Sequence, residues 1–174
     1  MLRTMIVDDE PLAIERMQVL CAEIDELAVI GTASDGEAAL RLADKLKPDL
    51  MLLDMTMPGI DGLTVARQLG RRPDPPAVIF VTAHEDFAVE AFDLEAVDYV
   101  LKPVAADRLE RAIDRAVARR EHSQTGGGEW LSEFWVPHRL GGSAPTLAEA
   151  NQLDADEAAE KAARRAQRPE TENG

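Results

Sequence analysis

Cysteine and positive charge are both scarce in this sequence. Of 174 residues only one, Cys21, is a cysteine, so a disulfide framework and a cysteine metal site are excluded. Basic residues number 19 against 33 acidic ones, which gives a formal net charge of −14. A chain this acidic is a poor partner for nucleic acid or an anionic membrane surface. The absence of disulfide chemistry fits a reducing compartment, so we expect a cytoplasmic protein.

Long apolar runs are absent, and histidine is rare. No apolar stretch approaches the roughly 20 residues that are needed to span a bilayer. The N-terminus lacks the pattern of a secretory signal. None of the 3 histidines falls at the end of an expected strand. Apolar residues still make up 45% of the chain, enough for one packed domain with some chain left over.

Residues 1–120 alternate strand and helix patterns five times. The expected strands are mostly apolar runs without polar–apolar alternation, as strands covered on both faces are. They span residues 3–7, 27–33, 50–54, 77–82 and 97–101. The expected helices have apolar stripes and lie near residues 11–24, 34–47, 62–69, 86–94 and 104–120. Ser34 and Glu37 form a capping-box pattern at the start of the second helix. This alternation predicts an α/β fold with a doubly wound parallel sheet.

The composition changes after residue 121. We expect a folded unit over 1–121, a linker and aromatic segment over 122–144, a helical tail over 145–168 and a disordered end over 169–174. The second of these segments contains Trp130, Phe134 and Trp135, and large aromatic side chains this close together favour docking on another surface. The helical tail is rich in alanine, so it has little apolar surface to bury.

Polar residues stand where four of the expected strands end. Asp8 and Asp9 follow the first strand, Asp54 closes the third, Thr82 closes the fourth and Lys102 follows the fifth. In an open α/β sheet the carboxyl ends of the strands share one edge, where ligands bind. Each residue alone has an ordinary explanation as a helix cap, a strand end or a surface charge. Their occurrence together at four strand ends favours a functional site.

These residue types suit phosphoryl chemistry. Clustered carboxylates repel one another unless a cation joins them, and carboxylate oxygens suit Mg²⁺. One carboxylate could then attack a phosphoryl group, while a lysine and a hydroxyl stabilise the charge that develops on its oxygens. Asp54, Thr82 and Lys102 have the right types for nucleophile, hydroxyl donor and cation. A Mg²⁺-dependent phosphohydrolase is an alternative, but it would need an acid–base residue near Asp54 and none is evident.

The motif Leu-Leu-Asp-Met-Thr-Met-Pro-Gly-Ile-Asp-Gly around Asp54 and the motif Asp-Tyr-Val-Leu-Lys-Pro around Lys102 complete this pattern. With them, residues 1–120 resemble the receiver domain of bacterial two-component response regulators. The resemblance implies a flavodoxin-like fold with five parallel strands in the order 2-1-3-4-5, followed by a C-terminal extension.

The resemblance also implies roles for the strand-end residues. Asp8 and Asp9 match the acidic pair that binds Mg²⁺, with Asp54 and the backbone carbonyl of Met55 as further ligands. Asp54 matches the phosphoacceptor. Thr82 matches the hydroxyl that moves toward the phosphate.

Five other residues match positions of known importance in the family. Tyr99 is similar to the switch aromatic, which would swing inward after phosphorylation. Lys102 is similar to the lysine that is joined to a proline, here Pro103, by a bond that is commonly cis. Thr56 and His84 occupy the two variable positions that tune the lifetime of the phosphoryl group.

The implied function is a switch rather than a metabolic enzyme. A sensor histidine kinase would phosphorylate Asp54, with self-phosphorylation and self-dephosphorylation as the only other chemistry. The surface formed by the expected helix at 86–94, strand at 97–101 and helix at 104–120 would then change, which would control homodimerisation or partner binding.

Residues 82–103 are similar to the subgroup of regulators that have LytTR-type DNA-binding domains. Residues 133–139 resemble the entry strand of such a domain, but only 35 residues follow Arg139, without a strand pattern. The effector is therefore either truncated or replaced, and the Gly-Gly-Ser hinge at 141–143 is also compatible with an engineered extension. A DNA-binding transcriptional regulator with a truncated LytTR output stays open as the alternative function. We expect no direct DNA binding by this chain because its tail offers no basic surface.

Overall fold

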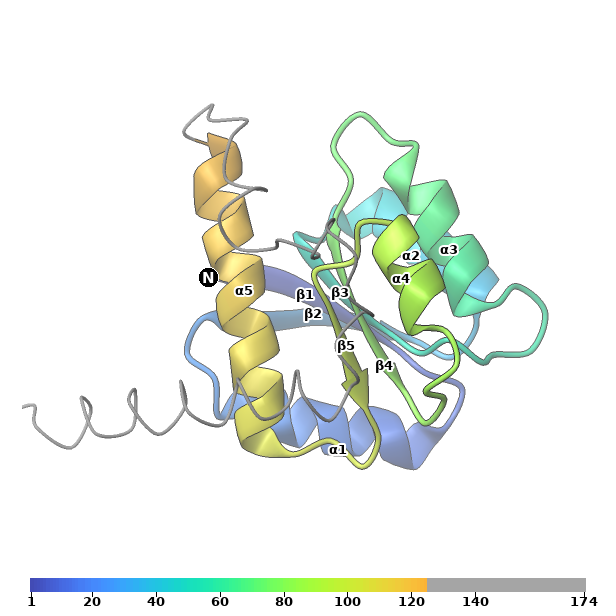
Figure 1. The fold of residues 1–174 in the computed structure, drawn as a ribbon, viewed down its shortest axis with the longest axis horizontal. Helices are drawn as coiled ribbons and strands as arrows, with labels where there is room; N and C mark the ends of the chain where they lie inside the picture. Colours follow the sequence, from blue (N-terminus) through green and yellow to red (C-terminus); the bar gives the residue numbers. More distant parts are fainter. Residues whose placement is uncertain (125–174) are drawn as a thin grey trace, which may run out of the picture. The chain divides into compact units, whose positions relative to one another are not determined.

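The computed structural model of the chain describes residues 1–124 (Figure 1). The predictions made above for residues 125–144, 145–168 and 169–174 lie outside the described residues. Among the residues that are described, no helix combines the length and the apolar character that a membrane crossing requires.

Five parallel strands form one sheet in the order β2-β1-β3-β4-β5 (Figure 1). The strands are β1 (Leu2–Val7), β2 (Leu27–Ala33), β3 (Leu50–Leu53), β4 (Ala77–Thr82) and β5 (Asp98–Leu101). All four residues of β3 are buried, as expected for the central strand of a sheet that is covered on both faces. The predicted fold class and strand order are confirmed.

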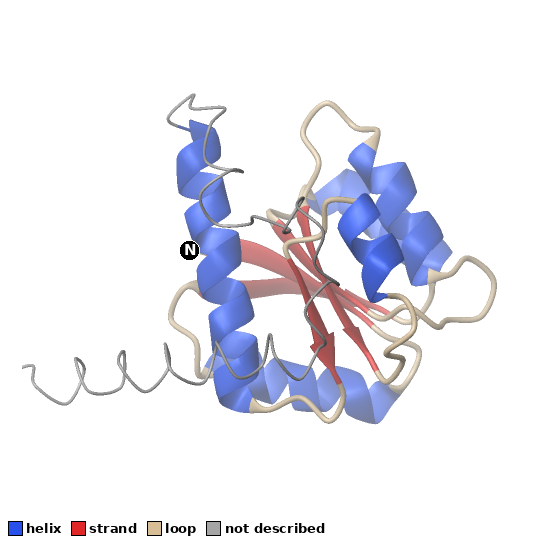
Figure 2. Ribbon diagram, viewed as in Figure 1, coloured by secondary structure: helices blue, strands red, loops and turns tan. Residues whose placement is uncertain are grey.

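Helices cover both faces of the sheet (Figure 2). They are α1 (Pro11–Ala22), α2 (Gly36–Leu46), α3 (Gly62–Gly70), α4 (Ala88–Asp93) and α5 (Ala106–Gln124). One apolar core lies under α1 and α5, and the other lies under α2, α3 and α4. Successive residues of β1 alternate between them, since Ile6 packs with the first core and Met5 and Val7 with the second.

The predicted capping box at Ser34 is wrong by one residue. The N-cap of α2 is Asp35, whose Oδ1 accepts a hydrogen bond of 2.7 Å from the Ala38 N–H. Strand β2 continues to Ala33, and helical geometry begins only at Gly36. An N-cap side chain accepts a hydrogen bond from the N–H three residues later, so the residue directly before Gly36, Asp35, is the cap. Glu37 instead lies 3.8 Å from Arg41 one turn later.

Helix α5 is longer than predicted. The sequence predicts an end at Arg120 and a linker from residue 122, whereas the helix continues through Gln124. Two side chains of the last turn contact backbone carbonyls one turn earlier. His122 Nδ1 lies 2.7 Å from the Ala118 carbonyl, and the Ser123 hydroxyl donates to the Arg119 carbonyl at 3.0 Å. Residues 121–124 contain neither glycine nor proline, so nothing in the sequence ends the helix earlier.

Cys21 lies on the buried side of α1, as predicted from its place in the apolar stripe. Burial raises the pKa of its thiol to about 11. The residue therefore stays protonated at neutral pH and acts as a small apolar side chain rather than a reactive one.

Lys47 ends α2 in the left-handed region, with φ of 49°. We predict that Lys47→Gly raises the free energy of unfolding by about 0.5–1 kcal/mol, because glycine adopts this conformation without a Cβ penalty. Lys45→Gly, in the last turn of the same helix, should lower it by about 1 kcal/mol. Urea denaturation of the two variants measures both values. A loss of stability in both would show that the backbone at Lys47 is not strained.

Candidate functional site

Three carboxylates meet at the carboxyl ends of β1 and β3. Val7 and Leu53 are paired in neighbouring strands, so Asp8 and Asp54 leave the sheet side by side. The Asp54 N–H donates to the Val7 carbonyl at 2.9 Å, which fixes this juxtaposition. One oxygen from each of Asp8, Asp9 and Asp54 lies within 4.8 Å of the others. Asp8 and Asp54 are buried, while Asp9 is exposed.

The oxygen atoms at this edge fit a hard divalent cation. Carboxylate oxygens at such separations are the ligands that Mg²⁺ takes in proteins, together with water. The Met55 carbonyl accepts a hydrogen bond from the Gly62 N–H at 2.9 Å, and a carbonyl oxygen retains a second lone pair for a ligand. The structure thus brings the three predicted carboxylate ligands to one place, with Met55 next to Asp54 in the chain, and the role of all four residues in metal binding stays a prediction.

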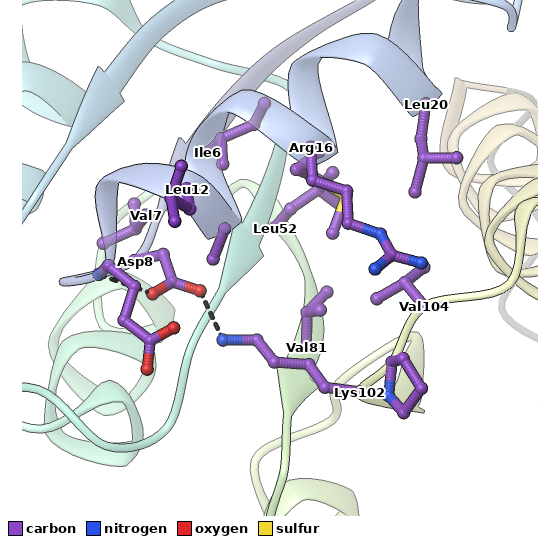
Figure 3. A pocket seen from close by; sticks show the side chains of 14 residues that line it. Ile6, Val7, Asp8, Leu12, Arg16, Leu20, Leu52, Val81, Lys102 and Val104 are labelled. Atoms are coloured by element: carbon purple, nitrogen blue, oxygen red, sulfur yellow. Dashed lines mark hydrogen bonds and ion pairs between the residues drawn. The ribbon is translucent and has the colours of Figure 1, made fainter.

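Lys102 is the cation that faces these carboxylates (Figure 3). Its Nζ lies 2.6 Å from Asp8 Oδ2 and 3.5 Å from Asp54 Oδ2. Burial works against the charged ammonium, but the hydrogen bond to Asp8 and the charge of Asp54 prevail and raise the pKa of Lys102. The lysine therefore stays protonated at neutral pH. The peptide bond between Lys102 and Pro103 is cis, as the resemblance implied.

Asp54 is a carboxylate in an unfavourable place. Burial raises its pKa, Lys102 opposes that rise, and the charge of Asp8 adds to it. Its Oδ1 accepts a long hydrogen bond of 3.4 Å from the Thr56 N–H. With one lysine shared between two buried carboxylates, the negative charge at this edge is only partly compensated.

The loop from β3 to α3 packs tightly against Asp54. A Cβ atom at Gly62 would lie 2.1 Å from the Asp54 carbonyl oxygen, so only glycine fits there. Gly59 has a φ of +78°, which also favours glycine. Asp61 caps α3 by accepting a hydrogen bond of 2.8 Å from the Thr64 N–H. The glycines and the aspartate after Asp54 therefore hold its backbone in place.

Thr82, Thr56 and His84 lie where the sequence predicts. Thr82 ends β4 and is fully buried, and its Oγ1 accepts a hydrogen bond of 3.3 Å from the His84 N–H. Thr56 is exposed beside Asp54, and His84 is exposed with its ring edge-on to Phe87 at 6.1 Å between centroids. The structure places all three next to the strand ends, and their effect on phosphoryl lifetime stays a prediction.

Tyr99 already points inward. Only 5% of the residue is exposed, its ring packs against Phe80 and its hydroxyl donates to the His84 carbonyl. Burial raises the pKa of its phenol. In this structure the inward place offers Tyr99 both an apolar pocket and a hydrogen-bond acceptor, and its movement inward after phosphorylation stays a prediction.

The sequence analysis missed an ionic cluster at the start of β5. Asp98 is buried and contacts two arginines of α5, with 2.7 Å between its carboxylate and each of Arg108 and Arg115. A signal was available, because an aspartate inside an apolar strand needs a buried partner. Arg108 and Arg115 are seven residues apart, so they lie on the same face of the helix.

An apolar cavity of about 440 Å³ opens beside the carboxylates (Figure 3). It lies between α1 and the segment that joins β5 to α5, and its wall includes Leu12, Leu20 and Val104. Asp8 and Lys102 form part of the same wall, so the cavity is continuous with the charged edge of the sheet.

Comparison with known proteins identifies relatives of this chain. The family model described as the response regulator receiver domain matches residues 4–114. The positive alginate biosynthesis regulatory protein of Pseudomonas aeruginosa is 48% identical over 145 residues, which cover 83% of this chain and 56% of that protein. The sensory transduction protein LytR of Staphylococcus haemolyticus is 40% identical over 114 residues, 66% of this chain and 44% of that protein. The chain spans about half the length of the curated relatives it matches.

Solved structures show the same architecture. The response regulatory domain of protein mrkE from Klebsiella pneumoniae has a TM-score of 0.66 with this chain and 31% sequence identity. The similarity covers 70% of this chain and 99% of that domain. It agrees with the matched family model and with the strand order described above.

We predict that Asp54→Asn stabilises the metal-free protein at pH 7 by about 0.5–2 kcal/mol, the usual range when a strained functional residue is neutralised. The folded state raises the pKa of Asp54, so its charged form costs stability above the ordinary pKa of aspartate. The advantage of Asn should therefore shrink as the pH falls toward about 4. Thermal unfolding at several pH values measures it. Asp61→Asn is the control, since Asn also caps a helix; an equal gain there would contradict the prediction.

Lys102 contacts the same Asp8 carboxylate that a bound divalent cation would use, so we predict that Lys102→Met binds Mg²⁺ several-fold more tightly than the wild type. At a Mg²⁺ concentration tenfold above its Kd the protein should gain about 1.4 kcal/mol of stability. Calorimetric titration and the Mg²⁺-dependent shift in Tm measure the two effects. Lys47→Met, which removes the same charge at an exposed and distant position, should leave the Kd unchanged. An unchanged Kd in Lys102→Met would show that the lysine does not compete.

Proposed function

The chain belongs to the response regulator receiver domain family, and on that basis we propose that it accepts a phosphoryl group from a sensor histidine kinase on Asp54. The family is a signalling switch rather than a metabolic enzyme. The observation that supports the assignment to Asp54 is its place beside Asp8, Asp9 and Lys102, within a cluster of carboxylate oxygens no more than 4.8 Å apart.

The proposed transfer is a single displacement. A carboxylate oxygen of Asp54 attacks the phosphorus, the bond from phosphorus to the imidazole nitrogen of the donor breaks, and an acyl phosphate forms. The ammonium of Lys102, 3.5 Å from Asp54 Oδ2, and the hydroxyl of Thr82 would stabilise the charge on the phosphoryl oxygens. Asp8, Asp9, Asp54 and the Met55 carbonyl would hold Mg²⁺, whose charge neutralises those oxygens.

The proposed contact for the kinase is the apolar cavity beside the site. It opens onto Asp8 and Lys102, so a helix seated there would present its histidine to Asp54. Leu12 and Val19 on α1 are 77% and 66% exposed. They are seven residues apart on one face of the helix, so they extend the apolar surface away from the cavity. An amphipathic helix of the kinase is the partner that such a surface fits.

The proposed output is homodimerisation or partner binding through α4, β5 and α5. Val89 and Phe92 of α4 are 71% and 43% exposed, which gives this face an apolar element. Glu85, Asp86 and Glu90 lie at its α4 edge, whereas the α5 edge is rich in arginine. A two-fold axis would place the acidic edge of one protomer against the basic edge of its partner.

The alternative is a transcriptional regulator in which a longer protein reads DNA through a LytTR-type domain. The match to the alginate regulatory protein covers 145 residues, more than the 124 that the structure describes, so it extends into the C-terminal part of the sequence. Because that relative is a regulatory protein about twice as long as the matched part, the similarity supports a transcriptional regulator as the function of a longer protein. We propose that this chain alone does not bind DNA, in view of its net charge of −14, and that it acts in the cytoplasm.

We predict that beryllofluoride with Mg²⁺ doubles the solution mass of the full chain, because it occupies the phosphoryl position on Asp54 and favours the associating state. Light scattering coupled to size exclusion measures the mass at several protein concentrations. Asp54→Asn should remain at its original mass. Asp61→Asn, which alters a nearby carboxylate outside the cluster, should respond as the wild type does.

If beryllofluoride with Mg²⁺ changes neither the solution mass nor the Tm of the wild type, phosphoryl acceptance at Asp54 is refuted. A response in Tm without a change in mass would retain the acceptor role and reject homodimerisation, leaving binding of another partner as the output. A salt-dependent shift of duplex DNA by this chain would support the alternative.

A further inference from the structure

Asp98 makes an unusually complete set of hydrogen bonds for a carboxylate in a strand. Its oxygens accept from the Tyr99 N–H at 2.7 Å, from both terminal nitrogens of Arg108 at 2.9 and 2.7 Å, and from Arg115 at 2.7 Å. Burial alone would raise the pKa of Asp98, and the two arginines hold it below its ordinary value. The carboxylate is therefore charged, buried and fixed in one orientation.

Asp98 and Arg108 also bind the peptide groups of Tyr99. Strand β5 lies at the edge of the sheet, with β4 as its neighbour. The Lys102 N–H donates to the Thr82 carbonyl on β4, and by the alternation of a parallel ladder the peptide groups of Tyr99 face the open edge. There the N–H of Tyr99 meets Asp98, and its carbonyl accepts from Arg108 at 3.1 Å. These contacts take the place of a sixth strand.

Tyr99 is thus held at two ends by different parts of the protein. Its hydroxyl bonds to the His84 carbonyl in the loop that follows Thr82, and its peptide groups bond to Asp98 and Arg108. The loop is directly joined to the phosphoryl site through Thr82, and Arg108 stands in the first turn of α5. A path of hydrogen bonds, through Thr82, the His84 backbone and Tyr99, therefore runs from the site to Arg108 on the helix of the proposed output face.

We propose that Arg108 is a positioning residue that keeps Tyr99 in its inward place and joins that place to α5. This inference rests on the proposed function, in which Tyr99 is the switch aromatic. The guanidinium is suited to the task because its fork spans the Asp98 carboxylate and the Tyr99 carbonyl together. A lysine has one compact ammonium on a flexible stem and does not reproduce that fork.

The chain contains one tyrosine, so 3-fluorotyrosine incorporated into the full protein gives a ¹⁹F signal from Tyr99 alone. The wild type should show one dominant resonance of a buried ring. In Arg108→Gln a second resonance, that of an exposed ring, should grow by about tenfold, the effect of losing a hydrogen bond to a charged group. Arg41→Gln removes the same charge from an exposed pair on α2 and should match the wild type.

The second measurement is the response to beryllofluoride. Because the contacts of Arg108 described above are with Asp98 and Tyr99 rather than with Asp8, Asp9 or Asp54, the apparent affinity for beryllofluoride should stay within about twofold, a change too small to reflect a lost contact at the site. The change in solution mass should weaken, since Tyr99 no longer links the site to α5. Asp98→Asn, which keeps the shape of the side chain, should alter the ¹⁹F spectrum in the same direction. Arg108→Lys should restore the wild-type spectrum only partly.

A purely structural role would give a different pattern. If Arg108→Gln and Asp98→Asn lower Tm but keep the single wild-type resonance well below Tm, the positioning role is overturned. Full rescue by Arg108→Lys would also overturn it, because charge alone would then suffice. If the wild type does not respond to beryllofluoride, the proposed function fails. The ¹⁹F spectra of the ligand-free wild type and Arg108→Gln still decide whether Arg108 positions Tyr99.

Discussion

Buried negative charge at the ends of β1 and β3 is the constraint on which the rest of the structure depends. The register of these two strands forces Asp8 and Asp54 to leave the sheet together, and both side chains are buried. Two such carboxylates repel each other in a medium of low dielectric constant, and one shared lysine compensates them only in part. A site with this deficit favours any ligand that brings positive charge, and it raises the free energy of the unmodified Asp54.

The backbone around Asp54 is fixed in place by close packing and hydrogen bonds. Gly62 lets α3 approach to within contact of the Asp54 carbonyl, and the Asp61 cap fixes the start of the helix. The Asp54 N–H is bonded to Val7 in the neighbouring strand. Asp54 is therefore held by its own backbone on both sides. The main chain at Asp54 therefore cannot move away from Asp8 without breaking these contacts, and this rigidity preserves the site.

The sequence predicted this site better than it predicted the elements around it. Carboxyl ends of parallel strands meet at one edge of a doubly wound sheet, so the strand pattern alone predicted that Asp8, Asp54 and Lys102 lie close together, as they do. The N-cap of α2 depends on where β2 stops, a property of sheet pairing, and Ser34 was chosen where Asp35 is correct. The end of α5 had no breaker to mark it. Each of these errors concerns a local boundary that tertiary contacts decide.

Asp98 and Asp54 show why one buried carboxylate could be assigned a function and the other was missed. Both are about equally buried, at opposite ends of their strands. Asp98 has two arginines that are part of the fold, so its pKa is lowered and it has no capacity for another cation. Burial and the charge of Asp8 raise the pKa of Asp54 against the opposing effect of Lys102, and because that lysine is shared with Asp8 the compensation is incomplete. A buried carboxylate whose partners all belong to the fold stabilises the orientation of its neighbours, as Asp98 does for the peptide groups of Tyr99. A buried charge that the protein satisfies only in part is available for interaction with a ligand, and that difference separates the carboxylate that we propose as phosphoacceptor from the structural one.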